Sequence, residues 1–250
     1  MIVTVFALKG GVGKTFVSIN LARKLSEDHR VLLLELDYQE SVPVFFGFRP
    51  EVYLSDVLMD PSSLRRALVS VGGVDVLPGG PGLFKLEFEA GSKILSNFSS
   101  LLTAVSRAYG VVVVDTHNVP GLLTEAVLGR SDVVVVPVRP GVLNMVGLQL
   151  TLNLLNKIGQ RNRSMRVVGV LNGVRRNVRS HREFMSSISS MGIFIHDYIP
   201  YSAVVERGEA GGLPVYSMDL RFLSPFEELV SAVLMPAVPQ GSGAVAEVKA

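Results

Sequence analysis

The 250-residue chain contains no cysteine. This absence excludes disulfide bonds, thiolate metal sites and iron–sulfur ligation, and it favours a reducing cytoplasmic compartment. No hydrophobic run approaches the roughly 20 residues that a membrane-spanning helix needs. The first residues enter an apolar run without a preceding basic region or a cleavage site, so we expect no secretory signal.

The interior of the chain also lacks any linker-like segment. With 48% hydrophobic residues the chain can bury a large core, and we expect a single domain over residues 1–235. Residues 236–250 are rich in proline, glycine and alanine, and we expect them to form a disordered tail. Because this tail has one lysine and no aromatic residue, it does not match an amphipathic membrane-binding helix.

Short apolar runs rich in valine, isoleucine and leucine alternate with longer helical patterns. Continuous hydrophobicity, without strict alternation, is typical of strands buried on both faces of a parallel sheet. We therefore expect an α/β fold with a mostly parallel β-sheet flanked by helices on both faces. The expected strands are 2–7, 31–36, 74–77, 111–114, 133–136 and 167–171, and the expected helices are 16–26, 92–107, 122–128, 142–158, 180–191 and 225–234.

A glycine-rich segment, Lys9-Gly10-Gly11-Val12-Gly13-Lys14-Thr15, lies between the first expected strand and the helix that begins at Phe16. Its glycines allow backbone N–H groups to face phosphate oxygens at the positive end of that helix. Lys14 would neutralise the β and γ phosphates, and the Thr15 hydroxyl would bind Mg²⁺. Residues 9–16 are therefore predicted to bind a nucleoside triphosphate.

Carboxylates directly follow two of the expected strands. Asp37 follows strand 31–36, and Asp115 follows strand 111–114. Ligands of parallel sheets bind at the carboxyl ends of the strands. Carboxylates there can reach a metal-bound water or the attacking water beside the phosphates. Either acid by itself could equally cap a helix or lie in a solvated turn.

The lysine ahead of the double glycine resembles the deviant Walker A motif of the ParA/MinD family of P-loop ATPases, although Leu8 stands where the usual phosphate-loop pattern has glycine. The resemblance implies binding of ATP and Mg²⁺ and catalytic roles for Lys9, Lys14 and Asp37. In that family, the extra lysine reaches across a dimer interface to the partner's ATP.

The resemblance extends over nearly the whole chain and implies further roles. Asp37 would orient or activate the hydrolytic water, and Asp115 would hold Mg²⁺ through water. Asn172 would read the adenine edge, although an asparagine can equally cap a turn. The stretches 54–58, 132–140 and 199–215 are also similar to the family.

The chain departs from the family pattern at three positions. The family usually has aspartate where Glu35 stands and proline where Tyr38 stands, and prolines are common after the acid that corresponds to Asp115, where this chain has His117. A histidine beside the γ-phosphate could tune hydrolysis or respond to pH, and it could equally be an ordinary loop residue. Asp37 is retained, so hydrolysis is still expected.

The formal net charge is only +2, yet the stretch between Asp132 and Glu183 contains no acidic residue. Arginine binds phosphate bidentately, so such a stretch suits the backbone of a nucleic acid. We expect Arg175, Arg176, Arg179 and Arg182 to contact DNA. The alternative is a solvated surface whose acids lie elsewhere on the fold. The cations are Arg139, Lys157, Arg161, Arg163, Arg166, Arg175, Arg176, Arg179 and Arg182.

The sequence most resembles ParA-type partition ATPases without an N-terminal helix-turn-helix. This resemblance implies an ATP-driven homodimer that binds nonspecific double-stranded DNA on the nucleoid. Hydrolysis stimulated by a ParB-like adaptor or another partner would release it, and the process would serve plasmid or chromosome partition. The alternative is a MinD-like ATPase that binds membrane and positions a division or other protein assembly. Metal-cluster carriers of this fold need cysteines, and no additional acid–base constellation indicates a small-molecule kinase or ligase.

Overall fold

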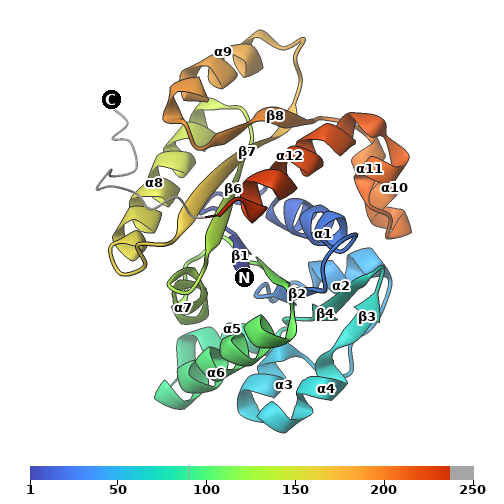
Figure 1. Cartoon of the computed structure of the whole chain (residues 1–250), viewed down its shortest axis with the longest axis vertical. Helices are drawn as coiled ribbons and strands as arrows, with labels where there is room; N and C mark the ends of the chain where they lie inside the picture. Colours follow the sequence, from blue (N-terminus) through green and yellow to red (C-terminus); the bar gives the residue numbers. More distant parts are fainter. Residues whose placement is uncertain (90, 237–250) are drawn as a thin grey trace.

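The computed structural model describes residues 1–89 and 91–236, which form an eight-stranded sheet covered by helices on both faces (Figure 1). The expected tail lies outside the described residues apart from Pro236. The strand order is β3-β4-β2-β5-β1-β6-β7-β8, and every neighbouring pair except the antiparallel β3–β4 pair is parallel. The strands are β1 (Ile2–Val5), β2 (Val31–Glu35), β3 (Val69–Val71), β4 (Val74–Leu77), β5 (Val111–Asp115), β6 (Val133–Val138), β7 (Arg166–Val174) and β8 (Phe194–Pro200).

Twelve α-helices connect these strands within the described residues. Their bounds are α1 (Lys14–Leu25), α2 (Ser41–Phe46), α3 (Leu54–Met59), α4 (Leu64–Ala67), α5 (Gly82–Glu89), α6 (Ser92–Ala108), α7 (Leu122–Leu128), α8 (Val142–Gly159), α9 (Arg179–Ile188), α10 (Val204–Gly211), α11 (Val215–Met218) and α12 (Leu223–Leu234). Among these described helices, none is both long and apolar enough to cross a membrane.

The core lies on both faces of the sheet, which explains the continuous hydrophobic runs. Within β5, Val111 and Val113 join the cluster under α1 and α12, whereas Val112 and Val114 join the cluster under α3 and α6. A third cluster packs α8 and α9 against β6 and β7. Successive side chains of these strands are buried on opposite faces of the sheet. Since burial of each valine or leucine side chain contributes about 1.5–3 kcal/mol to the free energy of folding, these strands form the stable centre of the fold.

Two strands were not predicted from the sequence. β3 is a three-residue edge strand joined to β4 through Gly72 and Gly73, both with positive φ. This is a two-residue hairpin turn with glycine in the positions that favour it. β8 is the opposite edge strand and carries His196 and Asp197 among partly exposed residues, so it lacks the continuous apolar run that identified the central strands.

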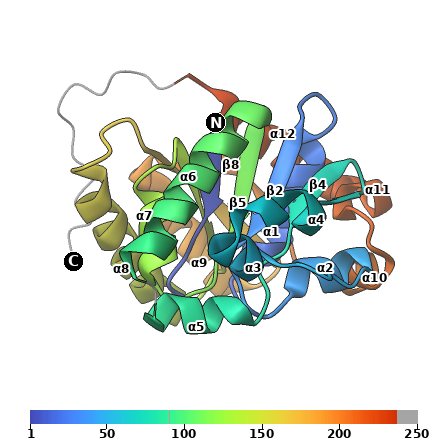
Figure 2. The same cartoon turned by 90° about the horizontal axis from the view of Figure 1, so that it is seen from below.

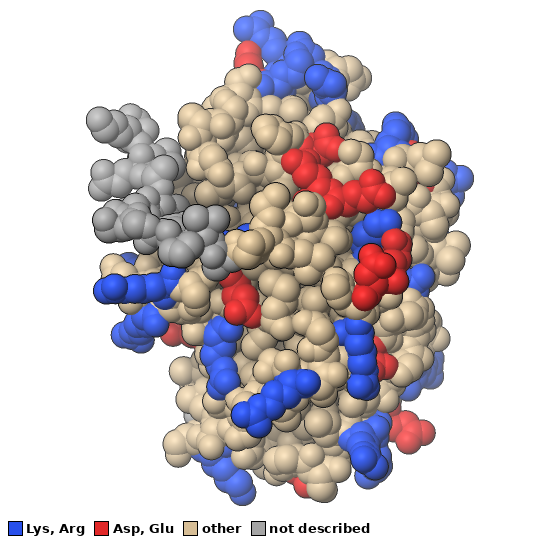
Figure 3. All heavy atoms as spheres, viewed as in Figure 1, with Lys and Arg blue, Asp and Glu red and all other residues tan. Residues whose placement is uncertain are grey.

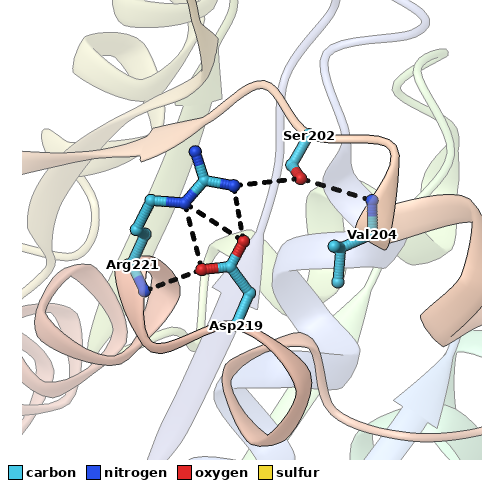
Figure 4. Close-up of polar contacts among 4 residues, drawn as sticks. All are labelled: Ser202, Val204, Asp219 and Arg221. Atoms are coloured by element: carbon cyan, nitrogen blue, oxygen red, sulfur yellow. Dashed lines mark hydrogen bonds and ion pairs between the residues drawn. The ribbon is translucent and has the colours of Figure 1, made fainter.

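A polar network joins the segment after β8 to the segment before α12 (Figure 4). The Arg221 guanidinium forms an ion pair with Asp219, whose shortest N–O distance is 2.6 Å, and it donates to the Ser202 hydroxyl at 3.4 Å. The same hydroxyl accepts from the Val204 N–H at 3.3 Å. These contacts fix the start of α10 relative to the turn that leads into α12.

The strands β2, β5 and β1 place the predicted functional residues together at their carboxyl ends. β5 pairs with β1 on one side and with β2 on the other, and Asp115 is in register with both Val5 and Glu35. The loops after these strands therefore emerge side by side. Figure 2 shows α2 and α5, which follow β2 and β4, along this same edge of the molecule.

Candidate nucleotide-binding site

The glycine-rich segment forms the turn between β1 and α1, as the sequence predicted. Gly11 and Gly13 have φ angles of 72° and 95°, in the left-handed region where side chains are disfavoured. A Cβ at Gly13 would lie 2.1 Å from the Asn172 amide nitrogen, so this position has no room for a side chain. The first turn of α1 follows immediately, and its free N–H groups suit phosphate oxygens.

Asn172 contacts this loop directly. It lies in β7, is 9% exposed, and its Nδ2 donates to the Val12 carbonyl at 2.8 Å. Phe16, by contrast, directs its ring toward the core, where the ring centroids of Phe222 and Phe226 lie 6.4 and 6.1 Å away. The backbone of Phe16 is therefore the part that can contribute to the loop.

Lys14 is 9% exposed and lies near both predicted acids. Burial lowers the pKa of its ammonium, and the charges of Asp115 and Asp37 oppose this shift. A buried cation between two carboxylates is stabilised by them, and it is placed to interact with an anionic ligand. The structure thus brings together Lys14, Asp37 and Asp115, which are far apart in the sequence.

Asp115 is fully buried at the end of β5. The Ser18 hydroxyl donates to its Oδ1 at 2.8 Å, whereas Oδ2 has no hydrogen-bond partner among the described residues. Burial raises the pKa of Asp115 to about 6, while the hydroxyls of Thr15 and Ser18 and the charge of Lys14 oppose the shift. A carboxylate with an unsatisfied buried oxygen beside a threonine hydroxyl is a donor set that fits Mg²⁺.

Asp37 lies in the loop between β2 and α2, partly exposed, and its Oδ1 accepts from the Gln39 N–H at 3.0 Å. Two residues earlier, Glu35 is fully buried, and its oxygens accept from the N–H groups of Val42 at 2.9 Å and Gly79 at 3.1 Å. Burial raises the pKa of Glu35 to about 8, and these two N–H groups oppose the shift. Sequence reasoning noted Glu35 only as a departure, because Gly79 is distant in the chain.

His117 is 6% exposed and lies near enough to Asp37 and Lys14 for their charges to act on it. Its Nδ1 accepts from the Val119 N–H at 2.9 Å, and its ring centroid is 5.6 Å from that of Tyr38. Burial lowers the pKa of the imidazole, and the charge of Asp37 opposes this shift. The departures at positions 38 and 117 therefore form one aromatic contact.

Two further cations border the loop. Lys9 is exposed, and its side chain passes over Gly147 of α8. The approach is close, because a Cβ added to Gly147 would lie 3.0 Å from the Cβ of Lys9. Arg139, at the end of β6, donates from Nη1 to the Gly11 carbonyl at 3.3 Å. Sequence reasoning counted Arg139 only within the basic stretch. The juxtaposition of β6 and β1 places it beside the loop instead.

The nine cations between residues 132 and 183 are close in the sequence but do not form one face of the fold. α8 leads from the carboxyl end of β6 to the amino end of β7. Residues 157–163 therefore lie near the amino ends of the parallel strands, and residues 175–182 lie near their carboxyl ends. The nine residues of β7 separate the two groups by roughly 30 Å. Figure 3 shows basic side chains over α9 and, separately, near the far end of α8.

All four predicted DNA-contacting arginines have partners within the chain, and the Arg176 Cζ lies 5.9 Å from the Tyr198 ring centroid. Arg175 stacks on Tyr201, with its Cζ 3.7 Å from the ring centroid, and Arg182 donates to the Arg176 carbonyl at 2.8 Å. Arg179 forms an exposed ion pair with Glu183 at 2.7 Å. Arg166 binds another part of the fold, because its guanidinium donates to backbone carbonyls at the C-terminal end of α12.

The sheet order, the glycine-rich turn and the acids beside it define a P-loop NTPase. A family model described as an AAA domain matches residues 1–167. The sporulation initiation inhibitor protein Soj of Bacillus subtilis is 31% identical over 179 residues, which cover 68% of this chain and 71% of Soj. The chromosome partitioning protein ParA of Caulobacter vibrioides is 28% identical over 227 residues, 85% of each chain.

A solved structure has the same fold. The AMPPNP-bound putative plasmid partition protein of Borrelia burgdorferi superposes with a TM-score of 0.80 at 19% identity, over 93% of this chain and 98% of that one. The chain belongs to the ParA family of P-loop ATPases.

Proposed function

We propose that this chain is an ATP-dependent molecular switch of the ParA type. ATP binding drives formation of a sandwich homodimer, the dimer binds DNA without sequence preference, and hydrolysis stimulated by a partner releases it. The process serves plasmid or chromosome partition on the nucleoid. The family membership supports the ATPase class. The similarity to the chromosome partitioning protein of Caulobacter vibrioides and to the putative plasmid partition protein of Borrelia burgdorferi supports the process.

The observation that carries the proposal is the convergence of three adjacent strand ends. The phosphate loop follows β1, Asp115 ends β5 and Asp37 follows β2, and these strands are neighbours in the sheet. A cationic loop that is flanked by two carboxylates suits phosphoryl transfer, which depends on positioning and on charge stabilisation. The glycine backbone binds the phosphates and Lys14 neutralises their charge.

Hydrolysis in this arrangement needs a positioned water. Asp37 orients the water and accepts its proton while the new oxygen–phosphorus bond forms. The bond from the γ-phosphorus to the β–γ bridging oxygen breaks, and ADP leaves with the electron pair. Thr15 and Asp115 would hold Mg²⁺, which supplies charge neutralisation and polarises the γ-phosphoryl group when bound. Asn172 is close enough to the loop to contribute to nucleotide binding as well.

Exposed apolar residues around the phosphate loop support the homodimer. Val44 on α2 is 74% exposed, Val119 after β5 is 58% exposed, and Leu143 on α8 is 74% exposed. The three segments follow the carboxyl ends of β2, β5 and β6, of which β5 and β6 flank β1 and β2 lies beyond β5. Exposed apolar patches of this kind mark protein–protein contacts. Lys9 lies at the border of this surface, which suits a role toward a nucleotide held by the partner.

The arginines that follow β7 are the proposed DNA contacts. Arg175, Arg176, Arg179 and Arg182 are clustered by the turn into α9, at the same edge as the phosphate loop. A dimer formed through that edge would bring two such clusters together, which increases phosphate contacts and salt dependence. Specific sequence recognition would then belong to a ParB-like adaptor.

Binding to random-sequence duplex DNA tests the proposal, measured with ATP and Mg²⁺, with ADP and without nucleotide across a salt series. We expect binding only with ATP, a steep decrease with salt, loss in Lys14→Ala and persistence in Asp37→Ala. Exchange of Arg175, Arg176, Arg179 and Arg182 for glutamine should abolish it. The matched control exchanges four exposed arginines elsewhere, Arg65, Arg66, Arg161 and Arg163, for glutamine.

Two results would contradict the proposal. Equal loss of DNA affinity in both four-arginine variants would remove the cluster after β7 as the contact. ATP-dependent dimerisation without DNA binding at any salt concentration would favour the alternative, a MinD-like ATPase. In that case, binding to anionic lipid vesicles is the next measurement.

A further inference from the structure

We propose that Glu35 and Gly79 together position Asp37 for hydrolysis, as a bracket that holds its loop from both sides. This inference rests on the proposed function, because it assigns to Asp37 the orientation of the attacking water. Neither residue touches the reacting atoms in this proposal. Both are positioning residues that act through Asp37.

Glu35 fixes the two ends of the loop that carries Asp37. It is the last residue of β2, it is fully buried, and one carboxyl oxygen accepts from the Val42 N–H in the first turn of α2. The loop therefore begins at Glu35 and returns to it seven residues later. Because the second oxygen accepts from the Gly79 N–H, the same side chain also joins this loop to the segment after β4.

Gly79 supports the loop through its backbone. A Cβ at Gly79 would lie 2.3 Å from the carbonyl oxygen of Asp37 and 2.8 Å from that of Glu35. The two backbones are thus in direct contact, and the glycine is required because no rotation of a side chain could relieve a contact of Cβ with a backbone oxygen.

The segment that contains Gly79 cannot retreat from this contact. A Cβ at Gly80 would lie 2.4 Å from the Tyr53 ring, and one at Gly82 would lie 2.7 Å from the Ser55 hydroxyl. The Pro78 carbonyl accepts from the Leu54 N–H at 2.7 Å. The segment 78–82 is therefore held between the start of α3 and the Asp37 loop.

Asp37 depends on this bracket because its own side chain has little support. The Asp37 side chain accepts from the Gln39 N–H, a contact within its own turn, and Asp37 is partly exposed. A displacement of about 1 Å at a catalytic group can cost on the order of a hundredfold in rate. Small shifts of the loop backbone would therefore change hydrolysis while the phosphate loop, which follows a different strand, keeps its nucleotide.

Two variants test the bracket in the full chain. Glu35→Gln replaces one of the two acceptor oxygens by an NH2 group, which cannot accept. Gly79→Ala introduces the clash with the Asp37 carbonyl oxygen. We expect both to lower the rate of ATP hydrolysis about tenfold and to change the dissociation constant of ATP less than about twofold. The matched controls are Glu51→Gln, at an exposed glutamate, and Gly91→Ala, where a Cβ would meet nothing within 4 Å.

Hydrogen exchange and a double-mutant cycle separate positioning from general damage. In the nucleotide-free protein, the amides of Val42 and Gly79 should exchange faster in Glu35→Gln, and the phosphate-loop amides should not. In an Asp37→Ala background, Glu35→Gln should cause no further loss of hydrolysis, since its effect passes through Asp37.

The outcomes that overturn the bracket differ from those that overturn the function. If both variants hydrolyse ATP like the wild type, or if each loses ATP binding and hydrolysis equally, Glu35 and Gly79 do not position Asp37. A further loss in the Asp37→Ala background would also reject the bracket. A wild type that does not bind ATP, or an Asp37→Ala variant that hydrolyses ATP as fast as the wild type, would reject the proposed function itself.

Discussion

Asn172 and Val12 are 160 positions apart in the chain, yet the Asn172 amide donates to the Val12 carbonyl at 2.8 Å. The bond joins β7 to the middle of the phosphate loop. It also explains Gly13, because the amide occupies the space that a Cβ at that position would need. The adenine-reading role expected for Asn172 remains a prediction, and the contact observed here gives it a second role as a brace for the loop.

Asn172→Ala removes this brace. We expect ATP affinity to fall about fivefold, because a hydrogen bond to a nearly buried carbonyl contributes about 1 kcal/mol and its loss leaves the loop less ordered. Isothermal titration with ATP and Mg²⁺ measures the change. Asn153→Ala, at an exposed position on α8, is the control. Unchanged affinity in Asn172→Ala would show that the loop holds its shape without this bond.

Ser18→Ala removes the hydroxyl that donates to Asp115. Oδ1 of the buried carboxylate would then lose the Ser18 hydrogen bond, and Oδ2 already has no partner among the described residues. We expect the free energy of unfolding to fall by about 1–3 kcal/mol. Urea denaturation of the nucleotide-free protein measures the loss. Ser96→Ala, at an exposed position on α6, should change stability by much less. Equal effects at the two serines would argue against the contact.

The stability of the nucleotide-free protein should depend on pH through Glu35. Burial raises the pKa of Glu35 from 4.5 to about 8, so the folded protein binds this proton more tightly than the unfolded chain. The resulting stabilisation is complete below pH 4.5 and is lost as the pH rises through 8.

Glu35→Gln lacks this titration. The difference in free energy of unfolding between wild type and variant should therefore decrease from pH 4.5 to 8, by at most about 1.4 kcal/mol per pH unit. Denaturation curves over this range measure it, and Glu51→Gln should follow the wild type. Parallel curves for wild type and Glu35→Gln would show that Glu35 does not titrate in this range.

Arg166 should act on stability and not on DNA binding. Its guanidinium donates to the carbonyls of Ala232, Val233 and Met235 at 3.0, 2.8 and 2.8 Å, at the end of α12. Charged donors at a helix C-terminus stabilise it. Arg166→Ala should lower the free energy of unfolding by about 1–3 kcal/mol without changing DNA affinity. Thermal melts and DNA titrations, with Arg161→Ala as control, separate the two effects. A loss of DNA affinity in stable Arg166→Ala would contradict this assignment.

The apolar surface near the phosphate loop should be needed for dimerisation. Leu143→Asp places a charge at a position that is 74% exposed in one chain, so the monomer should remain folded and bind ATP. Sedimentation with a nonhydrolysable ATP analogue should show a dimer for the wild type and a monomer for the variant. Met59→Asp, at a 63% exposed residue of α3, should still dimerise. A dimer in Leu143→Asp would place the contact elsewhere.

The sequence predicted the central fold and the phosphate loop well, for local physical reasons. The expected helix 122–128 matches α7, and the expected strand 74–77 matches β4. Strands that are buried on both faces of a sheet have continuous apolar sequences, which are easily recognised. A glycine-rich turn of this pattern between a strand and a helix is typical of a phosphate-binding loop. The edge strand β8 was not predicted, because partial exposure removes the apolar signal that identified the central strands.

The basic stretch shows the limit of reasoning along the chain. Nine cations follow one another without an intervening acid. The crossover helix α8 nevertheless carries the chain from the carboxyl end of β6 to the amino end of β7 and divides these cations between the two ends of the strands. Cations that are close in the sequence form one charged surface only where the chain between them does not cross the fold. Arg166, which has the same charge as its neighbours, binds a helix end instead.

The class of fold, the phosphate loop and the two acids can be predicted from the sequence, because each is encoded in contiguous residues with a characteristic order. Three relationships follow from the folding of the chain in space: Asn172 donates to Val12, Glu35 joins the Asp37 loop to Gly79, and the cations divide between the two ends of the strands. These relationships connect segments up to 160 residues apart. They arise when parallel strands are placed next to one another in an order that differs from their order in the chain.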